Sequence, residues 1–323
     1  MLFQAILEQM IFLFAFIVLG FIFAKGKFVP DNAAQVLSRL ENLLFIPALV
    51  LGTFIKNCTI ADLSRMWKLL VMSFAVLAVL IPLAIFVAKL CFKENYLRKV
   101  ATYGLAFSNF AYMGNAVVSG VFGETVFADY LVFCLPLWLG IYLWGVPVLL
   151  ISGSSENGEK VKFKDTLKNF LNPMLICTFI GIAIGLTGLG AKMPKSIVSV
   201  IDTAGGCMSP IAMLLTGMTI GKLDILQLLK RWRIYILAAV KLLLFPLLFI
   251  LIFAFIPQST FVSETFLICG LCITAMPIGL NTIVIPAGYG KDTTDAAGMA
   301  LVSHVLSVGT IPLIFMLFQL LVL

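Results

Sequence analysis

Charged residues are scarce in this sequence of 323 residues, since Asp, Glu, Lys and Arg together make up only 11%. A soluble globular protein uses about a quarter of its residues as charges that solvate its surface. Hydrophobic residues reach 62%, with 28 Phe among them, and the mean hydropathy is +1.12. This balance excludes a soluble enzyme, a nucleic-acid-binding protein and a disordered scaffold, and it predicts an all-α protein that spans a membrane many times.

Metal-binding and nucleotide-binding motifs are also missing. His304 is the only histidine, and the seven Cys are scattered along the chain. Cys269 and Cys272 form a Cys-x-x-Cys pair without nearby Cys or His partners, so we expect them to pack between helices. No P-loop is present, which disfavours ATP-driven pumping by this chain. The sequence therefore indicates no metal, no cofactor and no nucleic-acid partner.

Ten nearly charge-free stretches have the length of about 20 residues that a membrane-spanning helix needs. They are 4–24, 32–55, 67–90, 98–122, 127–152, 167–189, 197–221, 233–256, 262–288 and 294–321. Positively charged loops remain on the cytoplasmic side. With the N-terminus outside, the cytoplasmic loops hold fifteen Lys and Arg and the opposite loops hold five. This bias predicts a multi-pass protein of the cell membrane with both termini extracytoplasmic.

Prolines and a glycine recur at one spacing in the two halves of the chain. The matched positions are Pro47 and Pro210, Pro82 and Pro246, Phe122-Gly123 and Tyr289-Gly290, and Pro147 and Pro312, at separations of 163 to 167 residues. Each half has five spans, an odd number, so the second half must enter the membrane from the opposite side. We therefore predict two inverted repeats, 1–155 and 167–323, joined by a cytoplasmic loop at 156–166. Inverted repeats are typical of secondary transporters.

Spans four and nine carry uncharged polar residues and glycine at their centres. The candidate substrate-binding residues are Ser108, Asn109, Gly114 and Asn115 in span four, and Pro277, Gly279 and Asn281 in span nine. Pro277 should interrupt its helix because proline removes a backbone donor and clashes with the preceding turn. A half-helix that restarts near Pro277 directs its N-terminal N–H groups inward, which favours an anion. The alternative is that these Asn and Ser side chains only join helices together.

Ionisable residues within the predicted spans include Arg39, Glu41, Lys241 and His304. Glu41 and His304 are candidates for proton coupling, and the alternative for each is a buried structural role. We expect Arg39 and Lys241 to extend along their aliphatic stems toward an interface. Spans four and nine contain no pair of Asp residues, so the sequence shows no strong cation site.

The segments FSNFAYMGNAVVSGVFGE (107–124) and AMPIGLNTIVIPAGYGKD (275–292), with the five-plus-five plan, resemble the auxin efflux carrier family. This family includes bacterial malate- and malonate-type carriers and plant auxin exporters. The resemblance implies a fold like that of bile acid:sodium symporters and sodium/proton antiporters. Spans 1–2 and 6–7 would form a scaffold, and spans 3–5 and 8–10 a transport domain in which broken helices four and nine cross. It also implies that Asn109 and Asn281 face the substrate and that Pro277 marks the crossing.

The sequence thus predicts a transporter, not an enzyme, that moves a small organic anion such as malate, malonate or an auxin-like acid by elevator-type alternating access. Its partners would be the anion and the lipid bilayer. The coupling ion, H⁺ or Na⁺, and a homodimer stay open. The alternatives are a cation/proton antiporter or sodium-coupled symporter on the same scaffold, and an intramembrane enzyme. Ala116 stands where the family commonly has proline, which leaves the break in span four and the choice of substrate open.

Overall fold

The computed structural model describes residues 2–151, 173–222, 230–288 and 290–323. These residues are almost entirely helical and contain no strand beyond one isolated β-bridge. The first half consists of α1 (Leu2–Lys25), α2 (Ala33–Leu40), η1 (Glu41–Phe45), α3 (Ile46–Asn57), η2 (Ile60–Asp62), α4 (Leu63–Cys91), α5 (Asn95–Ala106), η3 (Phe110–Gly114), α6 (Asn115–Val121), α7 (Gly123–Gly140) and η4 (Ile141–Ile151).

The second half consists of α9 (Pro173–Leu186), η5 (Leu189–Lys192), α10 (Lys195–Gly206), α11 (Met208–Gly221), α13 (Trp232–Ala239), η6 (Val240–Leu244), α14 (Phe245–Ala254), α15 (Glu264–Ala275), α16 (Asn281–Gly288) and α17 (Thr294–Leu321). The predicted loop at 156–166 lies outside the described residues, and so does Tyr289 of the predicted repeat.

Seven helical stretches among the described residues are long and apolar enough to cross a membrane. They are Leu2–Lys25, Ala33–Asn57, Ile60–Cys91, Gly123–Ile151, Lys195–Gly221, Trp232–Ala254 and Thr294–Leu321. Three shorter apolar helices cover Phe110–Val121, Pro173–Leu186 and Glu264–Ala275. Large apolar side chains such as Phe86, Phe179 and Leu251 are exposed on the outside, as expected of a surface that faces lipid. The prediction of a helical multi-pass membrane protein is confirmed.

Four of the described helical stretches, η1, η3, η4 and η6, are π-helical. A π turn holds an extra residue, and such turns occur often at functional sites. Pro47 and Pro246 stand in the first turn of α3 and α14, each directly after a π stretch. Proline fits the start of a regular helix because its missing N–H is not needed there. The widened turns therefore adjoin positions where the sequence forces the backbone to rearrange.

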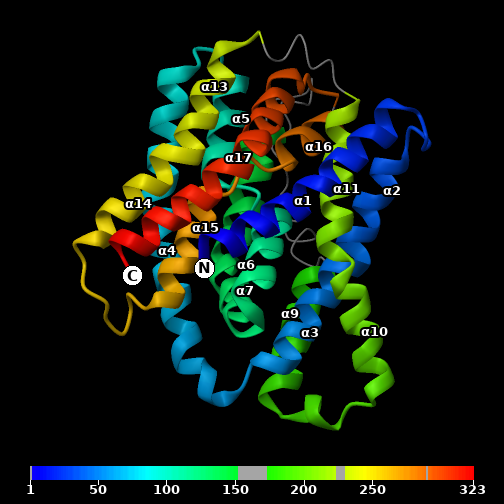
Figure 1. Cartoon of the computed structure of the whole chain (residues 1–323), viewed down its shortest axis with the longest axis vertical. Helices are drawn as coiled ribbons and strands as arrows, with labels where there is room; N and C mark the ends of the chain where they lie inside the picture. The colour runs from blue at the N-terminus through cyan, green and yellow to red at the C-terminus, as the bar shows by residue number, and fades with distance from the viewer. Residues whose placement is uncertain (1, 152–172, 223–229, 289) are drawn as a thin grey trace.

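The helices form two groups in space (Figure 1). On one side α1 packs along α11, and α3 packs against α9 and α10. On the other side α4 packs against α5 and α7, while α17 packs against α13 and α14. α1 also contacts α6 and α17, and α3 contacts α7, so these helices connect the two groups.

The two glycines that the predicted repeat aligns have the same backbone conformation. Gly123 has φ +82° and Gly290 has φ +70°, a region that residues with a side chain rarely adopt. Each glycine follows directly or closely on an interrupted helical segment, after α6 and after α16. This agreement supports the repeat, while the full arrangement as two inverted five-helix units stays a prediction.

Candidate functional site

Two interrupted helical segments meet in the middle of the structure. α5 ends at Ala106 and α15 ends at Ala275, and each is followed by a short extended stretch. The two stretches run antiparallel and form a β-bridge between Ser108 and Ile278. The backbone N–H of Asn109 donates to the carbonyl of Pro277 at 2.7 Å. Backbone groups that a continuous helix would have used are thus paired across the contact, which satisfies them within the apolar interior.

Pro277 interrupts its segment as predicted, but the next helix begins at Asn281 rather than near the proline. The reason is that backbone groups between Pro277 and Asn281 already form hydrogen bonds with other segments. The carbonyl of Pro277 accepts from Asn109, and the N–H of Ile278 donates to Ser303 Oγ at 3.1 Å. The chain can turn into α16 only after these bonds, where the N–H and hydroxyl of Thr282 both donate to the carbonyl of Gly279.

Ser108 and Asn109 hold the break between α5 and η3. Ser108 Oγ donates to the carbonyl of Ile273 at 2.8 Å and so joins the two segments. The carbonyl of Asn109 accepts from the N–H groups of Met113 and Gly114, which starts the π turn of η3. Asn109 itself is only 2% exposed. Its position at the start of a half-helix places its side chain beside the first N–H groups, which lack helical partners.

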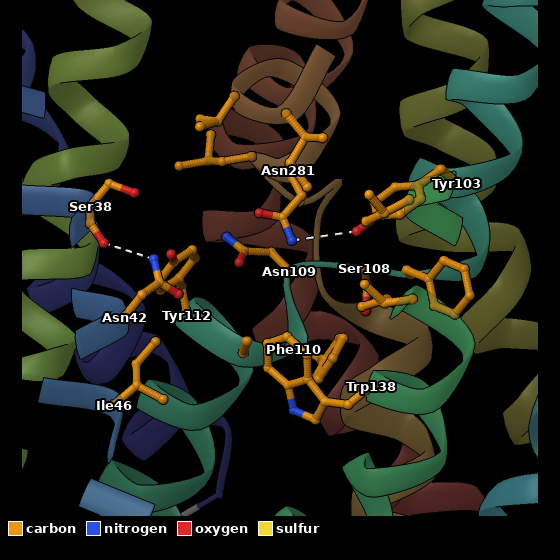
Figure 2. Close-up of a pocket in the computed structure, with 18 of the residues that line it drawn as sticks. Ser38, Asn42, Ile46, Tyr103, Ser108, Asn109, Phe110, Tyr112, Trp138 and Asn281 are labelled. Atoms are coloured by element: carbon orange, nitrogen blue, oxygen red, sulfur yellow. Dashed lines mark hydrogen bonds between the residues drawn. The ribbon is translucent and has the colours of Figure 1, made fainter. Parts of the chain in front are cut away.

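A cavity of about 220 Å³ adjoins this contact. One wall comes from Ser38, Asn42, Ile46 and Leu215, which belong to α2, η1, α3 and α11. Figure 2 shows Ser38, Asn42 and Ile46 on the side opposite to Asn109 and Asn281. The volume is small for a ligand pocket but has room for about seven water molecules at roughly 30 Å³ each. A compact organic molecule therefore fits between the two groups of helices.

The other wall consists of the two breaks and of aromatic residues. Residues 107–112 and 279–281 line the cavity, together with Tyr103, Trp138 and Tyr142. Asn281 Nδ2 donates to Tyr103 Oη at 3.4 Å, which orients the amide (Figure 2). No Asp, Glu, Lys or Arg occurs among the described residues that line the cavity. The groups that line the cavity are thus neutral amides, hydroxyls, backbone groups and aromatic rings.

The helices that follow the two breaks, η3 and α16, both begin at this cavity. η3 starts at Phe110 and α16 starts at Asn281, and both residues line the wall. The N-terminal end of a helix carries a partial positive charge and N–H groups without helical partners. At α16 the N–H groups of Thr282, Ile283 and Val284 already donate to the carbonyls of Gly279 and Leu280, so the helix dipoles, rather than free N–H groups alone, favour negative charge at this uncharged cavity. This arrangement suits an anion.

His304 lies behind Asn109 and is completely buried. His304 Nδ1 is 2.8 Å from the carbonyl of Ala300, which can only accept, so Nδ1 carries the hydrogen. In the neutral ring Nε2 is then an acceptor, and Asn109 Nδ2 donates to it at 2.9 Å. One hydrogen of the Asn109 amide is thereby used, and the ring fixes how the amide faces the cavity. His304 thus positions a residue of the wall but does not line the cavity.

Lys241 corrects one sequence prediction. We expected its side chain to extend toward an interface, but it is completely buried. Its amine donates to the carbonyls of Leu105 at 3.3 Å and Ile273 at 3.2 Å. The stem and the amine both lie in the contact between the segments, because the carbonyls near two helix ends lack helical partners and can accept from the amine. Arg39, in contrast, is exposed.

Glu41 is buried in the π turn of η1. Neither carboxyl oxygen has a hydrogen-bond partner among the described residues. The side chain does not line the cavity, although Asn42 beside it does. An ionised carboxylate is costly in such surroundings unless it is paired. Glu41 therefore stays a candidate for proton exchange, separate from the wall of the cavity.

Four of the seven predicted binding residues line the cavity, namely Ser108, Asn109, Gly279 and Asn281. Gly114, Asn115 and Pro277 do not line it. Gly114 serves packing, because a Cβ there would lie 2.2 Å from Tyr130 Oη. Tyr130 in turn donates to the carbonyl of Phe110 at 3.1 Å and so holds the π turn.

Sequence reasoning missed the polar and aromatic residues outside the two breaks. Ser38 and Asn42 stand four positions apart in the predicted span 32–55, a spacing that places both on one helical face. That spacing was the available signal for the wall opposite the breaks. Tyr103, Trp138 and Tyr142 carried no comparable signal, because aromatic residues are common throughout this chain.

The chain matches a known protein family. The family model described as membrane transport protein matches residues 5–315, nearly the whole chain. The match includes both breaks and all the helices that line the cavity. No curated protein matches the chain.

Proposed function

Because the chain belongs to the auxin efflux carrier family of membrane transport proteins, as its sequence motifs indicated, we propose that it carries a small organic anion across the membrane. The expected substrate is a carboxylate such as malate, malonate or an auxin-like acid. Membership in a transporter family favours this function over an intramembrane enzyme. Ser108, Asn109, Gly279 and Asn281 are the residues that we assign to substrate contact.

One observation carries the proposal: an uncharged polar cavity receives the N-terminal ends of two half-helices, and none of its described lining residues is a carboxylate. A carboxylate ligand can accept hydrogen bonds from the amides of Asn109 and Asn281, and the helix ends attract its charge. A cation would instead require acidic or carbonyl oxygens on the wall. The arrangement therefore supports an anion carrier better than a cation/proton antiporter.

We propose a ten-helix architecture in two inverted repeats, with α1–α3 and α9–α11 as scaffold and the remaining helices as transport domain. The cavity fits this division because Ser38, Asn42 and Leu215 lie on one wall and the two breaks on the other. A site at such a boundary can be exposed alternately on the two sides when one group of helices slides past the other. This elevator-type movement is part of the proposal.

The cavity lies on the predicted cytoplasmic side of the crossing. Its wall includes Ser38 in the first part of the span Ala33–Asn57, Val146 in η4 and Ile285 near the end of α16. With both termini outside, these ends of the segments face the cytoplasm. At 100 mV, inside negative, outward movement of one negative charge gains about 2.3 kcal/mol. Export of a monoanion then needs no coupling ion, whereas uptake needs H⁺ or Na⁺.

His304 is our first candidate for coupling to protons. A protonated ring would carry hydrogen on Nε2 as well, and Asn109 would then have to present its oxygen to the ring. The amide nitrogen would turn toward the cavity, where it can donate to a carboxylate. Proton uptake and anion binding would thus favour each other. Glu41 is the second candidate.

Binding of organic acids provides the first test. In a thermal-shift screen of the purified protein, we expect mono- and dicarboxylates to raise the melting temperature, and Asn281→Ala to weaken this effect by about tenfold in ligand concentration. Asn57→Ala is the matched control, because Asn57 ends α3 and does not line the cavity. In proteoliposomes, carboxylates that never move while Na⁺ or H⁺ exchanges freely would refute the anion proposal.

A further inference from the structure

Lys241 contacts the helices that precede the two breaks, α5 and α15, and does not line the cavity where η3 and α16 begin. It lies in the π turn η6, directly before α14, and its side chain has no exposed surface. The amine donates to one carbonyl on each interrupted segment, Leu105 at 3.3 Å and Ile273 at 3.2 Å. It is the one described lysine whose amine joins these two segments. Its place in the structure is therefore specific to the crossing.

The two carbonyls lie near the C-terminal ends of helices. Leu105 is the penultimate residue of α5, which ends at Ala106, and Ile273 lies two residues before the end of α15. The last carbonyls of a helix lack helical partners and carry a partial negative charge. Two such ends converge on a single amine, so both contribute partial negative charge at this point. A positive charge gains the most there.

The surroundings of the amine fit an ammonium ion held by dipoles. No carboxylate lies within ion-pair distance of Lys241 in the described part of the chain. The amine also lies 5.7 Å from the centroid of the Phe245 ring, a distance at which a cation is attracted by the face of the ring. The two helix ends and this ring are thus its only described electrostatic partners.

In transporters built from broken helices, unwound carbonyls and half-helix C-terminal ends coordinate the coupling cation. We infer that Lys241 is a tethered cation that fills this place in the crossing. The side chain moves with the transport domain and keeps the C-terminal ends of α5 and α15 joined at the crossing. The protein then needs no Na⁺ to assemble the crossing, and its transport rate is independent of Na⁺.

This role predicts that two variants of Lys241 respond differently to added cations. Lys241→Ala leaves a space in which the two carbonyls have lost their cation, and a small free cation can enter it. Lys241→Met removes the charge but fills the space with a side chain of similar length. Only the alanine variant should respond to added cations, whereas a purely structural hydrogen bond predicts no response in either variant.

The test measures melting temperature and transport in Na⁺, methylammonium or choline at equal ionic strength. We expect wild type to be the same in all three. Lys241→Ala should lose transport about tenfold or more in choline, because it loses two hydrogen bonds from a charged group. Methylammonium or Na⁺ should restore part of the rate and raise its melting temperature, and Lys241→Met should stay low in all three.

Lys56→Ala is the matched control, because Lys56 pairs with Asp202 at 2.8 Å and lies away from the crossing. The inference is overturned if Lys241→Met transports like wild type, or if Lys241→Ala responds to neither cation. Should both variants be too unstable for transport, the melting temperatures decide alone, and a cation effect confined to Lys241→Ala is required. This second readout needs no substrate, so it stands even if the proposed anion transport fails.

Discussion

Asn109→Ala is expected to lower the transport rate by about tenfold to a hundredfold, since the loss of a hydrogen bond to a charged ligand costs about 1.5–3 kcal/mol. The substitution removes the amide that faces the cavity and also leaves His304 Nε2 without its 2.9 Å partner. The backbone of Asn109 keeps its bond to Pro277, so the crossing itself persists. Uptake of labelled carboxylate into proteoliposomes, together with the melting temperature, separates loss of binding from loss of structure.

The hydrogen bond between Asn109 and His304 makes this prediction more specific. If His304 acts only by orienting Asn109, then His304→Ala also weakens transport, and adding it to Asn109→Ala costs little more. Residues joined in one hydrogen-bond network give such non-additive effects, whereas independent sites add. Strictly additive losses would show that His304 has a role of its own, as a direct proton carrier would.

Asn115→Ala tests a residue for which the sequence prediction and the structure differ. The sequence grouped Asn115 with Asn109, but Asn115 starts α6 and does not line the cavity. We therefore expect the apparent Kd for the anion to be unchanged in this variant. A loss of anion affinity equal to that of Asn109→Ala would show that the binding site extends further into the second half of the segment.

The interruption in span nine was predictable because it follows from local chemistry, whereas the break in span four, which has no proline at this point, was implied only by the family resemblance. Pro277 cannot continue a helix, and buried backbone groups freed by it need polar partners. Ser108, Asn109 and Asn281 supply side chains that can serve this purpose, and all three lie at the cavity. Local rules also predicted the helical stretches, since long apolar runs leave no other structure in a membrane.

The partners across the cavity were not predictable in the same way. Ser38 and Asn42 become part of the site only because α2 and η1 lie opposite the two breaks. Lys241 was assigned to an interface because a lone lysine in an apolar span has no local partner. Its actual partners, the carbonyls of Leu105 and Ile273, lie 136 and 32 residues away in the sequence. Their availability depends on two helix ends meeting in space, which no local pattern reports.

Gly217→Ala is expected to destabilise the protein by about 3 kcal/mol or more, the upper part of the range for overpacked cores. α1 and α11 approach each other so closely that a Cβ on Gly217 would lie 1.9 Å from the carbonyl oxygen of Ile17. A Cβ on Gly20 would lie 2.0 Å from the carbonyl oxygen of Leu214. Both obstacles are backbone atoms, so no side chain can turn away, and the two helices must separate.

The control for this prediction is Gly309→Ala in α17, where an added Cβ meets no atom within 4 Å. Alanine is favoured over glycine in a helix by about 1 kcal/mol, so this variant should be neutral or slightly more stable. The same intrinsic gain applies to Gly217→Ala, and the clash must exceed it. The measurement is the melting temperature and the monodisperse fraction in detergent. Equal melting of the two variants would mean that α1 and α11 separate at little cost, which a rigid scaffold in the proposed elevator movement does not allow.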